Sequence, residues 1–416
     1  MKDADKICAP QMEQSAVVFT VCSANYITKA LAMCQSVLDN NDKVDLIIAV
    51  LDRKREIDFD HPKISIKWVE DMNFPNYLQC AFKYNVIELN TAVKPFVALL
   101  LNETYNKVIY LDPDVLVYSS LNPILNELEV CSTVLSPHAL TPYRGTGRPD
   151  DVDLLRFGSF NLGFFAVKAS VHSNALLEWW HECCQSYCFY EPSQGLGVDQ
   201  KWMDLAPCFF EEIHVSKHPG INVAFWNLHE RAITFENGCW EVNKIYPLIF
   251  VHFSSYDDSD STAIAKKQTR FAAGSRPDFT LVREVYAEAL KRASLFTGKF
   301  DPSYGYAIME DGSVITDSLR RFYAVQLERD FRCVVDPFAV PGIVYNFAKR
   351  NRLLTSGTPQ GNHINFNDSQ QFNKKVRLIN AGFKLALRLL GPVRYAMLIR
   401  YLGSHASILK QLNLLK

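Results

Sequence analysis

The sequence lacks several features that would assign it at once to a functional class. It has no apolar run near the roughly 20 residues that a membrane-spanning helix needs. With 44 basic and 45 acidic residues, the formal net charge is -1, so the chain has no nucleic-acid signature. The 11 cysteines follow no regular spacing, and the opening segment MKDADKICAPQMEQS is too polar for a secretory signal. These absences predict a cytoplasmic globular protein whose thiols serve as small apolar side chains.

A chain of 416 residues that is 48% hydrophobic can bury a sizeable core in two or three domains. Helical patterns, among them 91–101 and 173–190, alternate with strand-like runs at 16–22, 45–52, 64–70, 107–111, 132–137, 161–167 and 247–253. This alternation predicts an α/β domain with a mostly parallel sheet. Ligands bind such sheets beyond the carboxyl ends of the strands, where SANY (23–26), DPD (112–114) and HFSS (252–255) fall.

The C-terminal part has a different texture. We expect a boundary after residue 258 and a mainly helical region over 259–416, with a linker or mobile loop at 354–369. After Asp368 there are nine basic residues and no acidic one. Apolar residues from Val376 to Leu390 recur every three or four positions, as on one helix face. Two interpretations stay open: a helix packed on its own domain, or a basic amphipathic tail (370–416) on an anionic membrane surface.

The acidic pair at the end of the run KVIYL is the most informative local feature. Asp112 and Asp114 flank Pro113 directly after a strand that reads as buried. Two carboxylates at one small site repel each other and raise a pKa unless a cation neutralises them. Mg²⁺ and Mn²⁺ prefer oxygen ligands, so the position predicts a divalent metal site.

A second group of metal-ligating residues lies in a predicted helix. It comprises His181, Cys183, Cys184 and Cys188. Because this group lacks a second ligand pair at zinc-site spacing, we interpret it as ordinary helix packing.

Six motifs together resemble the GT-A glycosyltransferases, and most closely the retaining family 8 group that includes glycogenin and bacterial lipopolysaccharide galactosyltransferases. In that family's order they are FTVCSANY, TAVKPF, VIYLDPDVLV, FNLGFFAVK, VDQKWMD and FVHFS, and they span residues 16–254. The resemblance implies that residues 1–258 form a Rossmann-like GT-A catalytic domain that binds a nucleotide sugar.

The resemblance assigns the metal centre residue by residue. Asp112 and Asp114 correspond to the family's Asp-x-Asp pair, which also contacts the donor, and His252 corresponds to its histidine ligand. Mn²⁺ or Mg²⁺ is the implied cofactor. Lys94 stands where the family has a basic residue, usually Arg, that binds the diphosphate or the sugar hydroxyls. A solvated helix charge is the alternative for Lys94.

The resemblance also implies a nucleotide-binding segment after the first strand. Asn25 and Tyr26 match residues that bond and stack on the base, while the backbone at Thr20 and Val21 would meet the base edge and ribose. The family commonly has Asp at the position of Ser23, and this departure weakens the inference of a uracil base. The alternative for Tyr26 is core packing.

Two further pairs correspond to residues around the donor sugar. Asn161 and Gly163 match the segment that lines the sugar, with tight strand packing as the alternative. Asp199 and Gln200 match the acidic and amide residues at the sugar and are the candidate catalytic pair; the alternative is a helix start capped by Asp199. The amide of Gln200 is a poor nucleophile, so a front-face substitution is the preferred mechanism.

The expected function is transfer of a hexose from a nucleotide sugar, UDP-hexose favoured, to a glycan or lipid-linked glycan. Cytoplasmic polysaccharide or lipopolysaccharide assembly at the inner membrane face would suit the basic tail. The loop 136–153 and the segment 222–231 are candidate acceptor regions. Two alternatives remain: a sugar nucleotidyltransferase, although FTVCSANY has no glycine, and a non-catalytic glycan-binding module.

Overall fold

The structure, a computed structural model, describes residues 15–57, 59, 61–257, 259–260, 263–297, 302–356, 370–405 and 407–410. Its contacts divide the chain into two compact units, Met1–Pro75 with Val86–Tyr304, and Asn76–Asn85 with Gly305–Lys416. This division differs from the expected boundary after residue 258. Helix α9 (Pro277–Ser294) explains the difference, because it buries Phe279, Val282 and Tyr286 in a core of the first unit.

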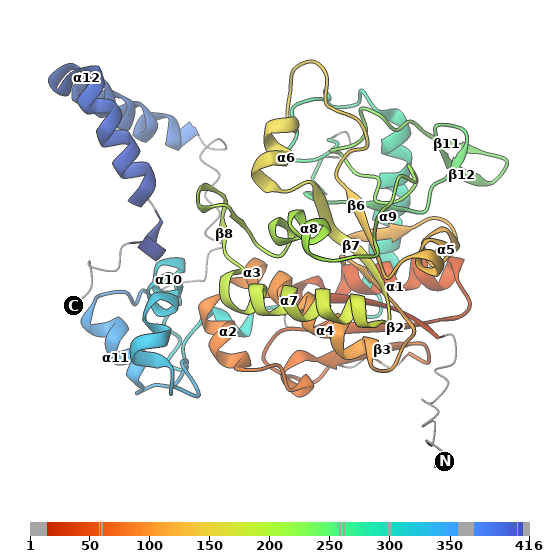
Figure 1. The fold of residues 1–416 in the computed structure, drawn as a ribbon, viewed down its shortest axis with the longest axis horizontal. Helices are drawn as coiled ribbons and strands as arrows, with labels where there is room; N and C mark the ends of the chain where they lie inside the picture. Colours follow the sequence, from red (N-terminus) through yellow and green to blue (C-terminus); the bar gives the residue numbers. More distant parts are fainter. Residues whose placement is uncertain are drawn as a thin grey trace, which may run out of the picture. The chain divides into compact units, whose positions relative to one another are not determined.

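The first unit is built on a seven-stranded sheet, and Figure 1 shows it with helices around it. Its strand order is β10-β6-β7-β4-β1-β2-β3. The strands are β1 (Ala16–Cys22), β2 (Val44–Val50), β3 (Ile64–Trp68), β4 (Lys107–Leu111), β6 (Thr133–Pro137), β7 (Phe160–Lys168) and β10 (Ile213–Val215). Only β7 runs antiparallel to its neighbours β4 and β6. The predicted α/β class with a mostly parallel sheet is therefore confirmed.

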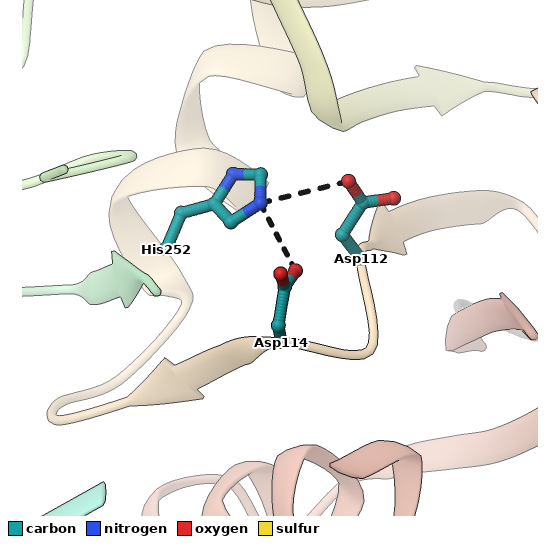
Figure 2. Close-up of side chains that lie close together, drawn as sticks. All are labelled: Asp112, Asp114 and His252. Carbon is teal, nitrogen blue, oxygen red and sulfur yellow. Dashed lines mark ion pairs between the residues drawn. The ribbon is translucent and has the colours of Figure 1, made fainter. Parts of the chain in front are cut away.

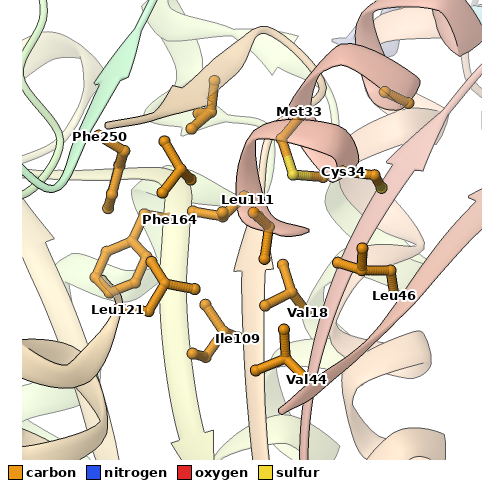
Figure 3. Packing of buried hydrophobic residues seen from close by; sticks show 14 of the residues in the cluster. Val18, Met33, Cys34, Val44, Leu46, Ile109, Leu111, Leu121, Phe164 and Phe250 are labelled. Carbon is orange, nitrogen blue, oxygen red and sulfur yellow. The ribbon is translucent and has the colours of Figure 1, made fainter. Parts of the chain in front are cut away.

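Helices cover both faces of this sheet. On one face Val18, Ile109 and Phe164 pack in a core with α1 (Ile27–Asn40), α5 (Asn122–Val130) and α9, and Figure 3 shows part of it. On the other face Tyr110 and Phe165 stack beneath α7 (Val171–Tyr187), and α4 (Lys94–Asn102) lies beside α7. Burying each such side chain contributes about 1.5–3 kcal/mol, which explains why the central strands are apolar on both faces.

Short elements complete the first unit. β5 (Val115–Val117) pairs with β14 (Phe250–His252) in a separate two-stranded sheet, so the strand expected at 247–253 is shorter than predicted and lies outside the main sheet. The helix expected at 91–101 is two helices, because α3 (Val86–Ala92) ends before Pro95 begins the first turn of α4. The others are α6 (Asp151–Phe157), β8 (Tyr190–Glu191), β9 (Leu196–Gly197), α8 (Ala206–Phe209), β11 (Ile233–Glu236), β12 (Cys239–Val242) and β13 (Tyr246–Pro247).

The second unit is helical, as predicted for the C-terminal region. It contains α2 (Tyr77–Lys83), α10 (Asp317–Gln326), α11 (Ile343–Arg350) and α12 (Gln370–His405). The buried Arg320 explains why residues 76–85 belong to this unit. Its guanidinium donates hydrogen bonds to the carbonyl oxygens of Ala81, Phe82 and Tyr84 at 2.8–2.9 Å.

Helix α12 carries the predicted amphipathic stretch. It bends at Gly391, whose φ is 71°, just before Pro392. From Arg377 to His405 its side chains are exposed or half-buried, so the alternative of packing on its own domain is not seen there. No helix in the described part of the chain is long and apolar enough to cross a membrane. Most of the predicted linker (357–369) and the tail residues 406 and 411–416 lie outside the described residues.

Candidate metal centre

The three predicted metal ligands come from two distant chain segments. Asp112 follows β4 and Asp114 precedes β5. Backbone hydrogen bonds fix the turn at both of its ends. The Asp112 amide donates to the Gly163 carbonyl at 2.8 Å, and the Phe253 amide donates to the Asp114 carbonyl at 2.8 Å. Because β14 pairs antiparallel with β5, His252 lies opposite Val115. Strand pairing thus brings the imidazole to the acidic turn.

The three side chains converge, as Figure 2 shows. His252 Nε2 lies 3.0 Å from Asp114 Oδ1 and 3.6 Å from Asp112 Oδ2. One ligand atom from each residue lies within 4.8 Å of the others, and no other group of three or more ligating residues occurs in the described part of the chain. Two carboxylates and one imidazole are a donor set that suits Mn²⁺ or Mg²⁺. The predicted metal pair and histidine are therefore together.

The electrostatics of the triad already reflect charge pairing. Burial alone would lower the pKa of His252, but Asp114 and then Asp112 raise it above its ordinary value. Burial would raise the pKa of Asp114, yet the imidazole of His252 holds it below its usual range. His252 and the acidic pair thus each favour the charged form of the other, and a divalent cation would compete with a proton on the imidazole.

Lys94, the predicted diphosphate or sugar contact, is buried and connects two carboxylates. Its Nζ lies 3.2 Å from Asp112 Oδ1 and 3.2 Å from Asp199 Oδ2, and it donates to the Leu162 carbonyl at 3.0 Å. Burial would lower the pKa of Lys94, but the two carboxylates raise it. The solvated-charge alternative is wrong, because the residue is 4% exposed.

The predicted catalytic pair lies at the start of a 3-10 helix, Gln200–Asp204. The Asp199 side chain makes no capping hydrogen bond, so the capping alternative is wrong. Burial raises the pKa of Asp199 to about 6, opposed by Lys94. Gln200 is held by backbone, since its Nε2 donates to the Phe157 carbonyl at 2.9 Å and its Oε1 accepts the Leu162 amide at 3.3 Å. Lys94 therefore couples this pair to the metal centre.

Asn161 and Gly163, predicted to line the donor sugar, lie against the imidazole of His252. Asn161 Oδ1 is 3.2 Å from His252 Nδ1. A Cβ atom added at Gly163 would lie only 2.3 Å from His252 Cε1. Asn161 thus lies at the ring nitrogen that does not face the acidic pair, and the missing side chain of Gly163 leaves room for the imidazole.

The predicted nucleotide segment follows β1 at the same edge of the sheet. The hydroxyl of Ser23 donates to Asn25 Oδ1 at 2.6 Å, and Asn25 and Tyr26 are exposed. Burial, then Asp114 and Asp112, raise the pKa of Tyr26, so its phenol lies within electrostatic reach of the metal centre. Core packing is not the role of Tyr26, which is 37% exposed.

The side chains of Thr20 and Val21 are buried. Their backbone pairs with Ile48 and Ala49 of β2, whereas pairing with β4 stops at Phe19. Any nucleotide contact at these two residues would therefore be made by the backbone, as the resemblance implies. The strand edge that faces β4 is the edge without strand pairing at these residues.

Two residues at the site were not predicted. Tyr110 donates its hydroxyl to Asp112 Oδ1 at 2.5 Å, and Lys29 places its ammonium 4.5 Å from the ring centroid of Tyr26. The strand period of two puts Tyr110 and Asp112 on one face, so a signal for Tyr110 was present in the sequence. Lys29 follows Tyr26 by three positions on a helix, which is a weaker signal.

The candidate acceptor loop is tied to the core. The Tyr143 hydroxyl donates to the Trp226 carbonyl at 2.6 Å, and Glu230 accepts the amides of Leu140 and Thr141 at 2.8 and 2.6 Å. Trp226 is buried and packs edge-on to His252, with the ring centroids 5.2 Å apart. An apolar cavity of about 470 Å³ between α1 and α9 includes none of the predicted site residues.

No family model matches the sequence. Two curated proteins of Bacillus subtilis (strain 168) are similar to it. "Uncharacterized protein YfnF" is 29% identical over 213 residues, which are 50% of this chain and 68% of that protein. "Uncharacterized protein YfnD" is 24% identical over 247 residues, which are 57% of this chain and 76% of that protein. These relatives establish a sequence similarity without naming an activity.

Solved structures with a similar chain path are named as glycosyltransferases. The galactosyltransferase LgtC, in complex with donor and acceptor sugar analogs, aligns at 14% identity and a TM-score of 0.40, over 67% of this chain and 95% of that chain. The bifunctional enzyme WbbM aligns at 13% and 0.40, over 68% of this chain and 50% of that chain. This chain thus spans half the length of WbbM.

Proposed function

We propose that the protein is a metal-dependent hexosyltransferase that uses a nucleotide-sugar donor, UDP-hexose favoured. The observation that carries this proposal is the Asp112, Asp114 and His252 triad at the carboxyl edge of a parallel sheet. The leaving group of such a reaction is a nucleoside diphosphate, which gains negative charge as the glycosidic bond breaks. A Mn²⁺ or Mg²⁺ ion held by the triad would stabilise that charge.

The residues around the triad fit a donor with a planar base and an electron-poor sugar carbon. Tyr26 has an exposed ring for base stacking, with Lys29 at one ring face. The pKa of Asp199, about 6, leaves this carboxylate mostly ionised at neutral pH. A buried negative charge beside the donor sugar stabilises positive charge at its anomeric carbon.

The proposed reaction retains configuration by substitution on one face. The bond from the anomeric carbon to the phosphate oxygen breaks, and the diphosphate keeps the electron pair. The acceptor hydroxyl oxygen bonds the same face of that carbon, and its proton passes to the leaving phosphate oxygen. Gln200, held by hydrogen bonds to Leu162 and Phe157, orients the sugar in this proposal. Its amide is a poor nucleophile, so the proposed reaction has no covalent intermediate.

A glycan or lipid-linked glycan is the proposed acceptor, in surface polysaccharide or lipopolysaccharide assembly on the cytoplasmic side of a membrane. Support comes from α12, where exposed basic residues (Arg377, Lys384, Arg388, Arg394, Arg400) alternate with exposed apolar ones. The basic side chains would attract anionic lipids, and the apolar side chains would insert at the boundary between the headgroups and the acyl chains.

The first test is the thermal unfolding midpoint with UDP, GDP, CMP, dTDP or ADP, each with Mn²⁺ and then with chelator. A ligand that binds only the native state raises its stability, by about 2.7 kcal/mol at 100 times its Kd. We expect one nucleotide, UDP, to raise the midpoint only with metal, and the matching nucleotide hexose to be consumed. No shift with any nucleotide would favour a non-catalytic glycan-binding module. Pyrophosphate release from a nucleoside triphosphate would favour the nucleotidyltransferase.

The membrane part has its own test. Reversing charge at Arg377, Lys384 and Arg388 should release the full chain from vesicles that contain phosphatidylglycerol. The matched control reverses Lys349 and Arg350, exposed at the end of α11, and should leave binding intact. Equal binding of all three proteins would remove the membrane proposal without touching the transferase.

A further inference from the structure

The imidazole of His252 is enclosed by residues that are not metal ligands. A Cβ atom at Gly163 would lie 2.3 Å from His252 Cε1 and 2.6 Å from Nδ1, closer than real Cβ contacts come. The indole of Trp226 meets the ring edge-on, at 88°. His252 itself is only 4% exposed. The ring therefore fills a fixed slot, and glycine is needed at residue 163 because the imidazole takes the space of a side chain.

One atom at the back of this slot fixes which nitrogen carries a proton. Asn161 Oδ1 accepts the backbone N–H of Gly163 at 3.2 Å and the side-chain amide of Asn222 at 3.1 Å. A backbone N–H can only donate, so the atom that it meets must be the amide oxygen. The same oxygen lies 3.2 Å from His252 Nδ1, which must then donate as well. Nε2 is left toward Asp114 and Asp112.

The amide oxygen is held in turn by buried neighbours. Asn222 is fully buried and has a φ of 57°, a backbone conformation that asparagine tolerates better than most residues. Its carbonyl accepts the side-chain amide of Asn227 at 2.9 Å. By contrast, the Nδ2 of Asn161 makes only long contacts, 3.4 Å to Gln200 and 3.5 Å to His138. The strong contacts of Asn161 thus point toward the metal ligand.

We propose that Asn161 is a positioning residue for the metal ligand His252, assisted by Gly163 and Asn222. It holds the imidazole with Nδ1 protonated and Nε2 toward the acidic pair, so that Nε2 is the nitrogen whose lone pair a metal ion takes when its proton leaves. This proposal rests on the proposed metal-dependent function and deepens it. It also differs measurably from a role in which Asn161 contacts only the donor sugar. A residue with only that role would not affect metal binding when no nucleotide sugar is present.

The test uses Mn²⁺ alone, titrated calorimetrically into the full chain with no nucleotide present. Asn161→Ala should weaken Mn²⁺ binding about 10–100-fold, the usual cost of losing a residue that orients a metal ligand. Asn161→Asp keeps an oxygen acceptor and should bind Mn²⁺ at least as tightly as wild type. Asn227→Ala is the matched control: it removes a buried asparagine of the same network that has no hydrogen bond to His252, and should change Mn²⁺ affinity less than twofold.

A spectroscopic signature separates positioning from general loosening. In the metal-free protein above the His252 pKa, ¹⁵N spectra of labelled histidine should show one neutral His252 tautomer, protonated at Nδ1, in wild type and in Asn161→Asp. Asn161→Ala should lose that single pattern. If Asn161→Ala does not fold, Asn222→Ala tests the same oxygen one residue further from the ring and should weaken Mn²⁺ binding severalfold.

The outcomes distinguish this inference from the proposed function. Wild-type protein that binds no Mn²⁺ would remove the metal centre, and the inference with it. Wild-type binding together with an unchanged affinity in folded Asn161→Ala would overturn only the inference and return Asn161 to the sugar. Loss of affinity in Asn227→Ala as large as in Asn161→Ala would also overturn it, because general loosening would then explain both.

Discussion

Two groups of metal-ligating side chains stand out in this protein, and only one of them converges. His181, Cys183 and Cys184 are near neighbours on α7. His181 packs edge-on to Phe74 at 5.4 Å and tilts against Phe96 at 5.3 Å, and burial raises the pKa of the Cys184 thiol. No set of three ligands forms there among the described residues.

The group at the sheet edge joins the acidic turn to a histidine that is far away in sequence, yet its three ligand atoms lie within 4.8 Å of one another. Adjacent helix positions point in different directions, so density of ligands along one helix does not make a site. Strand pairing does bring distant residues together, since β14 places His252 beside the acidic turn by pairing with β5. The contrast teaches that topology, rather than local ligand count, decides where a metal can bind.

The strongest way to break this contrast is to remove one carboxylate. Asp112→Asn and Asp114→Asn should each weaken Mn²⁺ binding by more than about 100-fold, beyond the cost of losing an orienting neighbour. Transferase activity should fall by about a thousandfold, because charge on the leaving diphosphate loses its counter-charge. Calorimetry and product analysis measure the two effects, with circular dichroism to verify folding. Full activity in a folded variant would rule out the metal assignment.

The second-largest loss of Mn²⁺ affinity is expected from a side chain that fills the space taken by the imidazole of His252. Gly163→Ala places a methyl group where the imidazole lies, so it should weaken Mn²⁺ binding about 10–100-fold and lower stability by about 1–3 kcal/mol. Gly382→Ala in α12 is the control, since an added Cβ atom there would have no atom within 4 Å. Denaturant unfolding and Mn²⁺ titration give both numbers. Equal behaviour of the two variants would contradict the slot.

Acid should weaken metal binding through His252. Its pKa is raised in the metal-free protein, so below that pKa Mn²⁺ must displace a proton from the ring. Apparent affinity should therefore rise with pH, by up to about tenfold per unit, and level off above the His252 pKa. Titrations in two buffers with different ionisation enthalpies count the released protons. Affinity that is flat from pH 6 upward would argue against a histidine ligand.

A smaller effect should come from Tyr110, whose hydroxyl donates to Asp112 Oδ1. Tyr110→Phe removes this bond but keeps the ring that stacks on Phe165 at 5.2 Å. Losing a hydrogen bond to a charged group costs about 1.5–3 kcal/mol, of which only the part that orients Asp112 affects the metal. We expect Mn²⁺ affinity to fall about fivefold. Calorimetry against wild type is sufficient, and no change would limit Tyr110 to packing.

The smallest effect on metal binding is expected at the group of ligating residues on α7. The double change His181→Gln with Cys183→Ser should leave the number of bound Mn²⁺ or Zn²⁺ ions and their affinities within about twofold of wild type, because these side chains point apart along one helix. Loss of one equivalent of Zn²⁺ in this variant would show that α7 carries a site after all.

Much of the fold could be predicted from the sequence. The runs at 16–22 and 107–111 are strands with the predicted bounds. Short runs rich in β-branched and aromatic residues between polar segments favour strands over other structure. The small sheet of β11, β12 and β13 was not predicted, because several of its residues are exposed and show no regular alternation. The unit boundary was also missed, since the pattern of α9 indicates a helix without saying which core it joins.

By itself the sequence determined most strands of the main sheet and the acidic turn after β4, because these depend on local pattern and residue chemistry. The third candidate ligand, His252, was assigned through the family resemblance. Only the tertiary structure decided that Lys94 faces two carboxylates and that Gly163 and Asn161 enclose His252. Those contacts join residues from different strands and helices. Their distances depend on strand order and register, which a single sequence does not display.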